Sequence, residues 1–327
     1  MASAIAINRG RMKILITGAS GFIGQHLVQT LAKDDFDIVA FARKPLPNLK
    51  KLRVNIIVGD IRNGEKIREA AKSSDSIIHL AAFGVNVNQS IEHPLHTFDV
   101  NVMGTLTILE LARKFDLERI IFASSSSIYG HPQYVPIDEN HPLNPIHPYA
   151  ASKAAAEHAC MSYHKIYSLP VVCLRLSAVY GSGGHTYIDN FINLITNNAP
   201  LIIPEDRSYS RNYTYIKDCI YAFQLSLAKK GIEGEAINIA GSEHFDLNTI
   251  IDKLTNNYKN ENFTYLKQID RSLSDTEKKR TRYKPIDINK AKKFLGYYPK
   301  YNLDRGIIDY KKCIETINYS KIRHKKI

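Results

Sequence analysis

Tyr149 and Lys153 are a pair of residues whose types and spacing could do chemistry. They occur in the run Tyr-Ala-Ala-Ser-Lys, and side chains four positions apart lie on one face of a helix. A phenol with an ordinary pKa of about 10 is a poor base at neutral pH. A neighbouring ammonium group lowers that pKa, so the pair could take a proton from a substrate hydroxyl group. Taken alone, the same pair also fits an ordinary solvated helix.

Four consecutive serines, Ser124–Ser127, stand at the end of the apolar run Arg-Ile-Ile-Phe-Ala-Ser, which is typical of a buried strand. A serine hydroxyl at this position could hydrogen-bond the same substrate oxygen that Tyr149 deprotonates. The serines therefore favour the catalytic interpretation of the Tyr149–Lys153 pair.

A glycine-rich segment follows the first apolar run of the chain. Gly18, Gly21 and Gly24 have the spacing GxxGxxG between a predicted strand and a predicted helix. Gly18 would permit the tight turn, Gly21 would let the backbone approach a pyrophosphate, and Gly24 would let the helix pack closely. Free N–H groups at the start of the helix would then face the phosphates. This context predicts a dinucleotide-binding turn.

The end of the second predicted strand bears on the kind of dinucleotide. An acidic residue there would bind the adenine ribose hydroxyls, but the chain has Arg43 and Lys44 instead. Two cations suit a 2′-phosphate and favour NADP. The alternative is that Arg43 stacks on the adenine and the cofactor is NAD. Asp60, after the third strand, could accept a hydrogen bond from the adenine amino group.

Short apolar runs alternate with helical patterns through the first half of the chain, which predicts a doubly wound parallel α/β sheet with a smaller C-terminal lobe. The expected strands are 13–17, 37–42, 54–58, 76–80, 119–124, 171–176 and 236–239, and the expected helices include 21–32, 101–114, 149–167, 247–258 and 288–295. We expect a dinucleotide-binding domain at 12–176 with returns to the sheet at 212–241, a substrate-binding lobe at 177–211 and 242–315, and a basic tail at 316–327.

Composition places the 327-residue chain among ordinary globular proteins, with 44% hydrophobic and 23% charged residues. Its four cysteines are scattered and form no metal-ligand pattern, so we expect no metal and a reducing, cytoplasmic location. No apolar run is long enough for a membrane span. The net charge of +12 lies almost entirely after residue 270. This excess of positive charge fits either a basic surface exposed to solvent or a surface that attracts an anionic small ligand. The sequence has no stripe of alternating basic and aromatic residues that would indicate nucleic-acid binding.

At this point the chain resembles the extended short-chain dehydrogenase/reductases, specifically the NAD-dependent epimerase/dehydratase group that acts on nucleotide sugars. The resemblance covers roughly residues 12–315. Its motifs are TGASGFIG (17–24), GDIR (59–62), HLAA (79–82), NVMGT (101–105), SSSSIYG (124–130), PYAASK (148–153), LRLSAVYG (174–181), RNYTYIKD (211–218), INIAG (237–241) and DINKAKKFLGYYP (287–299).

The resemblance implies that Tyr149 is the base, that Lys153 binds the cofactor ribose, and that Ser125, four residues before Tyr129, is the catalytic serine. Ser126 and Arg211 would face the substrate, and Arg280 or Arg282 would replace a missing nucleotide-binding arginine. With Arg43 and Asp60, the cofactor contacts would come from Gly18, Ser20, Gly21, Phe22, Ile23, Gly24, Ile61, Leu80, Ala81, Ala82 and Asn101.

Departures from the family pattern limit what can be said of the substrate. Where the 4,6-dehydratases have Asp-Glu, this chain has Ser126 and Ser127, so dehydration is disfavoured. Ser177 and Ala178 replace the usual Phe-Asn, which leaves the sugar and the nucleotide open. We expect a nucleotide-sugar 4-epimerase that oxidises C4 transiently. An NADP-dependent 4-keto-sugar reductase is the alternative, and a non-catalytic dinucleotide-binding scaffold is a third possibility.

The family also associates about a two-fold axis through the helices expected at 101–114 and 149–167. A homodimer is therefore expected here. The residues that favour it are apolar and exceed what one sheet face can cover, namely Leu106, Leu109 and Leu111 on the first helix and Ala155, Ala159 and Met161 on the second.

Overall fold

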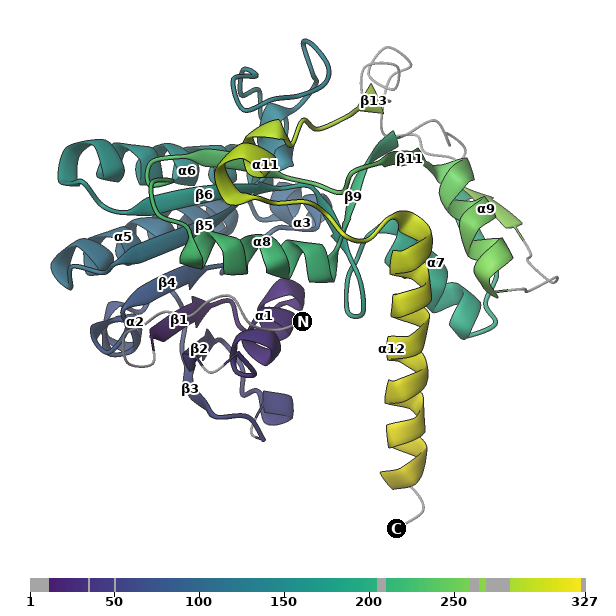
Figure 1. Ribbon diagram of the computed structural model, residues 1–327, viewed down its shortest axis with the longest axis horizontal. Coiled ribbons are helices and arrows are strands. Elements are labelled where there is room, and N and C mark those ends of the chain that lie inside the picture. Colours follow the sequence, from purple (N-terminus) through teal and green to yellow (C-terminus); the bar gives the residue numbers. More distant parts are fainter. Residues whose placement is uncertain are drawn as a thin grey trace.

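The centre of the molecule is a seven-stranded sheet (Figure 1). The computed structural model describes residues 12–34, 36–49, 51–204, 210–258, 265–268 and 283–324. The strands are all parallel and lie in the order β3-β2-β1-β4-β5-β6-β10. Their bounds are β1 (Lys13–Thr17), β2 (Asp37–Ala42), β3 (Val54–Val58), β4 (Ser76–His79), β5 (Arg119–Ser125), β6 (Val171–Leu176) and β10 (Ala236–Ile239). The predicted doubly wound parallel sheet is confirmed.

The inner strands of this sheet are buried on both faces, which is why they are mostly apolar. Ile14 and Ile16 of β1 point into one hydrophobic cluster, whereas Leu15 between them points into a second cluster on the opposite face. Successive side chains of a strand alternate between faces, so a strand covered on both sides is apolar at most of its positions.

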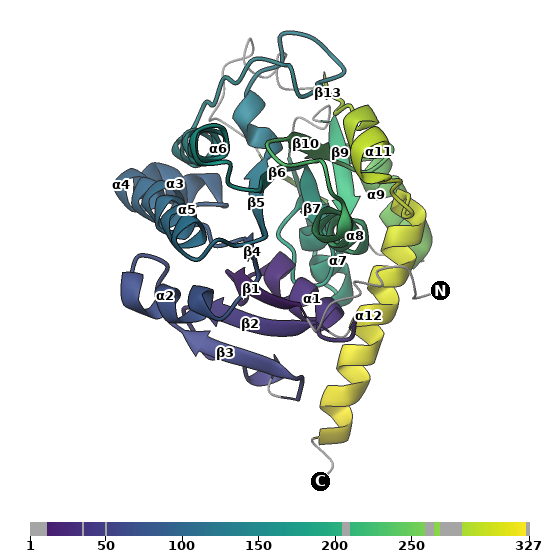
Figure 2. The ribbon, with the colours of Figure 1, turned by 60° about the vertical axis from the view of Figure 1, so that its left-hand side comes forward.

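Helices cover the two faces. Figure 2 shows α2, α5 and α6 on one side of the sheet and α1 and α8 on the other. The helices that flank or precede this sheet are α1 (Phe22–Leu31), η1 (Pro47–Leu49), α2 (Gly64–Lys72), α3 (Val87–Glu92), α4 (Pro94–Phe98), η2 (Asp99–Met103), α5 (Gly104–Lys114), η3 (Ser126–Tyr129), α6 (Pro148–Tyr167), α8 (Ile216–Ala228) and α11 (Asn289–Leu295). The helix expected at 101–114 is thus divided between the π-helical turn η2 and α5.

The remaining elements form the smaller lobe at one end of the sheet (Figure 1). They are β7 (Ala178–Tyr180), α7 (Tyr187–Thr196), β8 (Leu201–Pro204), β9 (Ser210–Tyr215), β11 (His244–Asp246), α9 (Leu247–Tyr258), β12 (Tyr265–Gln268), β13 (Tyr283–Lys284) and α12 (Leu303–His324). Strand β9 pairs with β7, β11 and β13, so only α8 and β10 of the segment 212–241 return to the large sheet. The boundary expected after residue 315, between the substrate-binding lobe and the basic tail, falls within helix α12.

No helix in the described part of the chain has both the length and the apolar character that crossing a bilayer requires.

Candidate active site

A cleft of about 1950 Å³ runs along the carboxyl edge of the sheet and is closed on its far side by the smaller lobe. Parallel doubly wound sheets bind their ligands at this edge, where the strands end and the chain turns. Seventeen of the residues expected from the sequence to form the site line the cleft: Gly18, Ser20, Gly21, Phe22, Ile23, Gly24, Arg43, Asp60, Ile61, Leu80, Ala81, Ala82, Ser125, Ser126, Tyr149, Lys153 and Arg211. Arg211 lines it from the lobe.

The glycine-rich turn has the geometry that a pyrophosphate requires. Gly18 has a φ of +70°, and a Cβ on it would lie 2.7 Å from the backbone nitrogen of Ala81. A Cβ on Gly24 would lie 2.3 Å from the carbonyl oxygen of Gly18, so the predicted close packing of α1 on the turn is confirmed. Helix α1 has no side-chain cap and no acidic residue in its first turn. Its free N–H groups therefore suit an anion, and the turn fits a dinucleotide.

The end of the cleft beside β2 and β3 is lined by Arg43 and Asp60, and Arg62 bonds Asp60 from outside the lining. The exposed Arg43 lies on the cleft wall, and Asp60 lies near it. The Asp60 carboxylate accepts hydrogen bonds from Nε and Nη2 of Arg62 at 2.8 and 2.9 Å. These bonds lower the pKa of Asp60 to about 2, and the charge of Arg43 adds to the effect. Asp60 is therefore ionised at neutral pH and partly balances the charge of Arg43.

Asn101 is placed differently from the sequence-based expectation. Its side chain is buried beneath the cleft and does not line it. The side-chain amide accepts a hydrogen bond from the Phe83 N–H at 2.7 Å and donates one to the Phe83 carbonyl at 3.0 Å. It also donates to the Ser152 hydroxyl on α6 at 2.9 Å. Asn101 thus holds the backbone after β4 against the helix that carries Tyr149.

Ser125 and Tyr149 meet in the cleft, as the sequence predicted. Burial raises the pKa of the Tyr149 phenol to about 12, and a hydrogen bond from the Ser125 side chain opposes this rise. Ser125 Oγ also lies 2.9 Å from Ser127 Oγ and accepts a hydrogen bond from the Ser127 N–H. Without a bound cofactor the pKa of Tyr149 is therefore raised and not lowered, because burial outweighs the hydrogen bond from Ser125. A further positive charge in the cleft would be needed to produce the phenolate.

Lys153 lies one helical turn after Tyr149 and is almost completely buried at the cleft wall. Its ammonium nitrogen lies 4.0 Å from the centre of the Phe122 ring. Burial lowers the pKa of Lys153 to about 8, against raising effects from Cys160, Cys173 and Glu157. Burying an ammonium group costs free energy, and contact with an aromatic ring offsets only part of that cost. A polar ligand that hydrogen-bonds the ammonium group would reduce the remaining cost.

Sequence reasoning missed the ion pair that supports this helix. Glu157 lies one turn beyond Lys153, and Arg175 of β6 donates Nη2 to its Oε1 at 2.6 Å and Nε to both its oxygens. Both side chains are buried. Nη1 of Arg175 also donates to the Tyr129 hydroxyl at 2.8 Å. One guanidinium therefore ties the Tyr149–Lys153 helix to the segment that follows Ser125.

The lobe side of the cleft gathers polar aromatic residues around a cation. Arg211 on β9 lies close to Tyr213 and Tyr187, which oppose the lowering of its pKa by burial. The Tyr213 hydroxyl is buried and has no hydrogen-bond partner among the described residues. Arg280 and Arg282, expected from the sequence to assist here, lie outside the described residues.

A dinucleotide-binding turn with serine, tyrosine and lysine in the same cleft defines a short-chain dehydrogenase/reductase. The profile of the NAD dependent epimerase/dehydratase family matches residues 14–240, and the chain belongs to this family.

Several relatives share nearly the whole chain. A protein of Methanocaldococcus jannaschii named putative UDP-glucose 4-epimerase is 33% identical over 308 residues, which are 90% of this chain and 95% of that protein. The structure of a Bacillus cereus UDP-glucuronic acid 4-epimerase with UDP-glucuronic acid and NAD has a TM-score of 0.82 and 30% identity, covering 94% of this chain and 100% of that one. A Thermotoga maritima UDP-glucose 4-epimerase with UDP-glucose has a TM-score of 0.84 and 25% identity, covering 93% and 99%.

Proposed function

We propose that this chain is a nucleotide-sugar 4-epimerase. The observation that carries the proposal is the meeting of Ser125 and Tyr149 in one cleft with the glycine-rich turn. Tyr149 removes the proton of the sugar C4 hydroxyl, and the Ser125 hydroxyl holds the same oxygen. After the sugar has turned over in the cleft, Tyr149 returns a proton to that oxygen on the inverted centre.

The cofactor would lie on the turn at Gly18–Gly24, with Lys153 holding its ribose. When bound, the nicotinamide ring accepts a hydride from C4 and returns it, and its positive charge favours the phenolate. Ser126 and Ser127 occupy the positions after the catalytic serine. Neither is an acid or base at neutral pH, so these residues support epimerisation and not the elimination of water.

The lobe wall supports a diphosphate-linked substrate. Arg211 supplies a positive charge, and the buried Tyr213 hydroxyl has no partner among the described residues. Leaving a buried hydroxyl unpaired costs about 1–3 kcal/mol, a cost that a phosphate oxygen of the ligand would remove. UDP-glucose and UDP-glucuronic acid, which relatives act on or bind, are the first substrates to examine.

The test is an NMR screen of UDP-, GDP- and dTDP-sugars for interconversion at C4, together with absorbance at 340 nm. We expect inversion of one sugar with no net consumption of NADH or NADPH. Stoichiometric consumption of either reduced cofactor with a 4-keto sugar would instead identify a reductase.

We further propose NAD as the cofactor, although the sequence favoured NADP. Relatives of known structure contain NAD, and the Asp60 carboxylate near Arg43 reduces the positive charge available to a 2′-phosphate. We expect Arg43→Asp to lower NADP affinity at least tenfold and to change NAD affinity less than about threefold, because Asp can accept from the ribose hydroxyls. Lys44→Asp, the neighbouring exposed cation, is the control. Titration with both cofactors decides, and tighter binding of NADP than of NAD by the unaltered protein would contradict the proposal.

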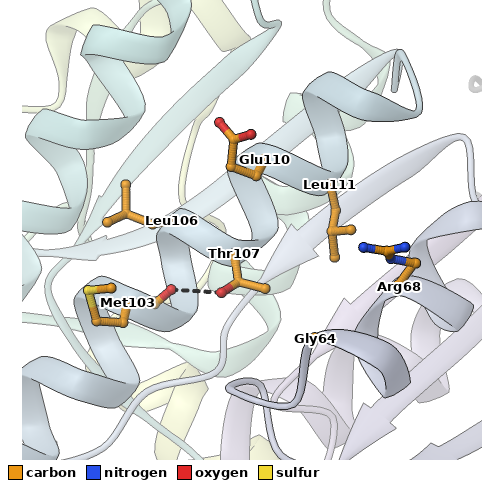
Figure 3. Close-up of a pocket in the computed structure, with 7 residues that line it drawn as sticks. All are labelled: Gly64, Arg68, Met103, Leu106, Thr107, Glu110 and Leu111. Carbon is orange, nitrogen blue, oxygen red and sulfur yellow. Dashed lines mark hydrogen bonds between the residues drawn. The ribbon is translucent and has the colours of Figure 1, made fainter.

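We propose a homodimer formed by α5 and α6. Leu109 and Leu111, expected to favour it, are covered by the protomer's own core, but Met103 is exposed and Leu106 is half-buried. Figure 3 shows Met103 and Leu106 projecting from neighbouring turns beside a pocket of about 330 Å³. Exposed apolar residues grouped on one face favour an interface.

This dimer has a direct test in light scattering at micromolar concentration. The unaltered protein is expected at twice the protomer mass of 37.0 kDa, and Leu106→Glu at the protomer mass, because a charge cannot be buried in an apolar interface. Val58→Glu, which replaces an exposed apolar residue on β3, should leave the dimer intact. A monomeric unaltered protein would reject the proposal.

A cytoplasmic location stays a prediction from the sequence. The four cysteines are unpaired thiols in the structure, which a reducing compartment would maintain.

A further inference from the structure

The loop between β7 and α7 forms part of the substrate side of the cleft. It runs from Gly181 to Thr186, and His185, Thr186, Tyr187 and Asn190 line the cavity. Two of its glycines have positive φ angles, +149° at Gly181 and +91° at Gly183. Within the loop, the Gly184 N–H donates to the Gly181 carbonyl oxygen at 2.8 Å, and the other polar backbone groups need partners outside it.

A buried carboxylate, Asp189, holds this loop from the inside. Its Oδ1 accepts the Gly181 N–H at 2.8 Å, and its Oδ2 accepts the Thr186 N–H at 2.7 Å and the Thr186 hydroxyl at 2.8 Å. A Cβ on Gly184 would lie 2.5 Å from Oδ2, so the loop wraps closely around the carboxylate. Asp189 itself is 2% exposed and does not line the cleft.

The outer side of the loop rests on the cofactor helix. The carbonyl oxygen of Ser182 lies 2.8 Å from Nε2 of His26 on α1. The Phe22 ring, which itself lines the cleft, would be 3.7 Å from a Cβ on Gly183. The loop is therefore fixed between α1, which the cofactor is expected to contact, and Asp189 of α7.

The charge on Asp189 is held by several donors. Burial raises the pKa of this carboxyl above its ordinary value, and hydrogen bonds from Gly181, Thr186 and Tyr310 oppose the rise. Tyr310 belongs to α12, so the same carboxylate joins the loop to the last helix of the lobe. Removing an acceptor of this kind leaves buried N–H groups unpaired.

We propose that Asp189 is a positioning residue that sets the affinity for the nucleotide-sugar substrate by fixing the loop of residues 181–186 and the start of α7. The proposal rests on the proposed function for the identity of the ligand. Asp189 does not line the cleft and so would touch neither the cofactor nor the substrate. It acts through His185 and Tyr187, whose places on the wall depend on the backbone that the carboxylate holds. Its effect should therefore fall on substrate binding and leave the chemistry at Tyr149 unaltered.

Asp189→Asn tests this proposal with little change in volume. The amide places an NH₂ group against the N–H of Gly181 or of Thr186, and one bond becomes repulsive. We expect KM for the sugar found in the NMR screen to rise at least tenfold, with kcat within about threefold and NAD affinity within about twofold. UDP binding, measured by calorimetry without turnover, should weaken by the same factor as KM rises. Asp252→Asn, an exposed carboxylate on α9, should change none of these values.

A milder pair of variants covers the case in which Asp189→Asn does not fold. Thr186→Val removes one donor to Asp189 and should raise KM about threefold, and Thr186→Ser, which restores the hydroxyl, should return it to normal. An unchanged KM in both Asp189→Asn and Thr186→Val overturns the proposal. So does a fall in kcat at constant KM, since this would place the effect on the catalytic helix.

The two proposals can fail separately. If the unaltered protein binds UDP, epimerises no sugar, and loses UDP affinity on Asp189→Asn, the positioning role stands and the proposed function fails. If the unaltered protein epimerises a sugar but Asp189→Asn changes neither KM nor UDP affinity, the proposed function stands and the positioning role fails. A protein that binds none of UDP, GDP and dTDP overturns both.

Discussion

Tyr149→Phe is expected to lower kcat about 10³-fold, within the range typical for loss of a general acid–base group. The substitution removes only the phenolic oxygen, and the ring keeps its place at the start of α6 beside Ser125. NAD affinity should stay within about threefold, since the turn that would hold the pyrophosphate is on another element. Steady-state kinetics and NAD titration measure the two effects.

Tyr167→Phe is the matched control for that variant. It removes the same atom from the same helix at a half-exposed position away from the cleft, and it should leave kcat unaltered. A loss of less than tenfold in Tyr149→Phe would show that another group takes the proton.

Lys153→Met is expected to give an inactive protein that is more stable than the original when free of cofactor. The lowered pKa of Lys153, about 8 against an ordinary 10.5, corresponds to about 3 kcal/mol that burial of the ammonium costs. Met fills a similar volume without a charge. We expect kcat to fall at least 100-fold, NAD affinity to fall at least tenfold, and stability at pH 7 to rise by about 1–3 kcal/mol.

The pH dependence of this gain has a definite sign. Below about pH 8 the lysine is protonated in both the folded and the unfolded states, so the cost is present in full. From pH 8 to 10.5 the folded state has lost the proton that the unfolded chain keeps, and stability rises with pH. The difference between Lys153→Met and the original protein should therefore shrink over this window. Thermal melts at pH 7 and 10 measure it, and a variant less stable at pH 7 would mean that Lys153 is a structural cation.

Local patterns account for what the sequence predicted well. The strands at 13–17, 37–42, 54–58, 171–176 and 236–239 are mostly apolar, as expected for a parallel sheet covered by helices, and their bounds agree with the structure. The glycine-rich turn is equally local, since the spacing of Gly18 and Gly24 follows from one close contact of helix and strand.

Features that depend on distant residues were not predictable in this way. Strand β9 has the polar sequence Ser-Arg-Asn-Tyr-Thr-Tyr, and it forms a strand because β7, β11 and β13 pair with it. Arg175 and Asp189 each look like ordinary charged residues in the sequence. Their roles follow from tertiary contacts with Tyr129 and Gly181, which no periodicity encodes. The pKa of Tyr149 was missed for the same reason, because burial is a property of the folded chain.

The hydrogen bonds around Arg175 also constrain how the protein can be made. The Tyr129 hydroxyl that Arg175 contacts donates in turn to Asn238 of β10, and the Asn238 amide donates to the carbonyl groups of Ile137 and Asp287. A nascent chain that has left the ribosome only as far as residue 176 already carries Ser125, Tyr149 and Lys153. It nevertheless lacks the partners that complete the support beneath them. The hydrogen-bond network beneath the catalytic residues is thus completed only after β10 and Asp287 have been synthesised, late in the translation of the chain.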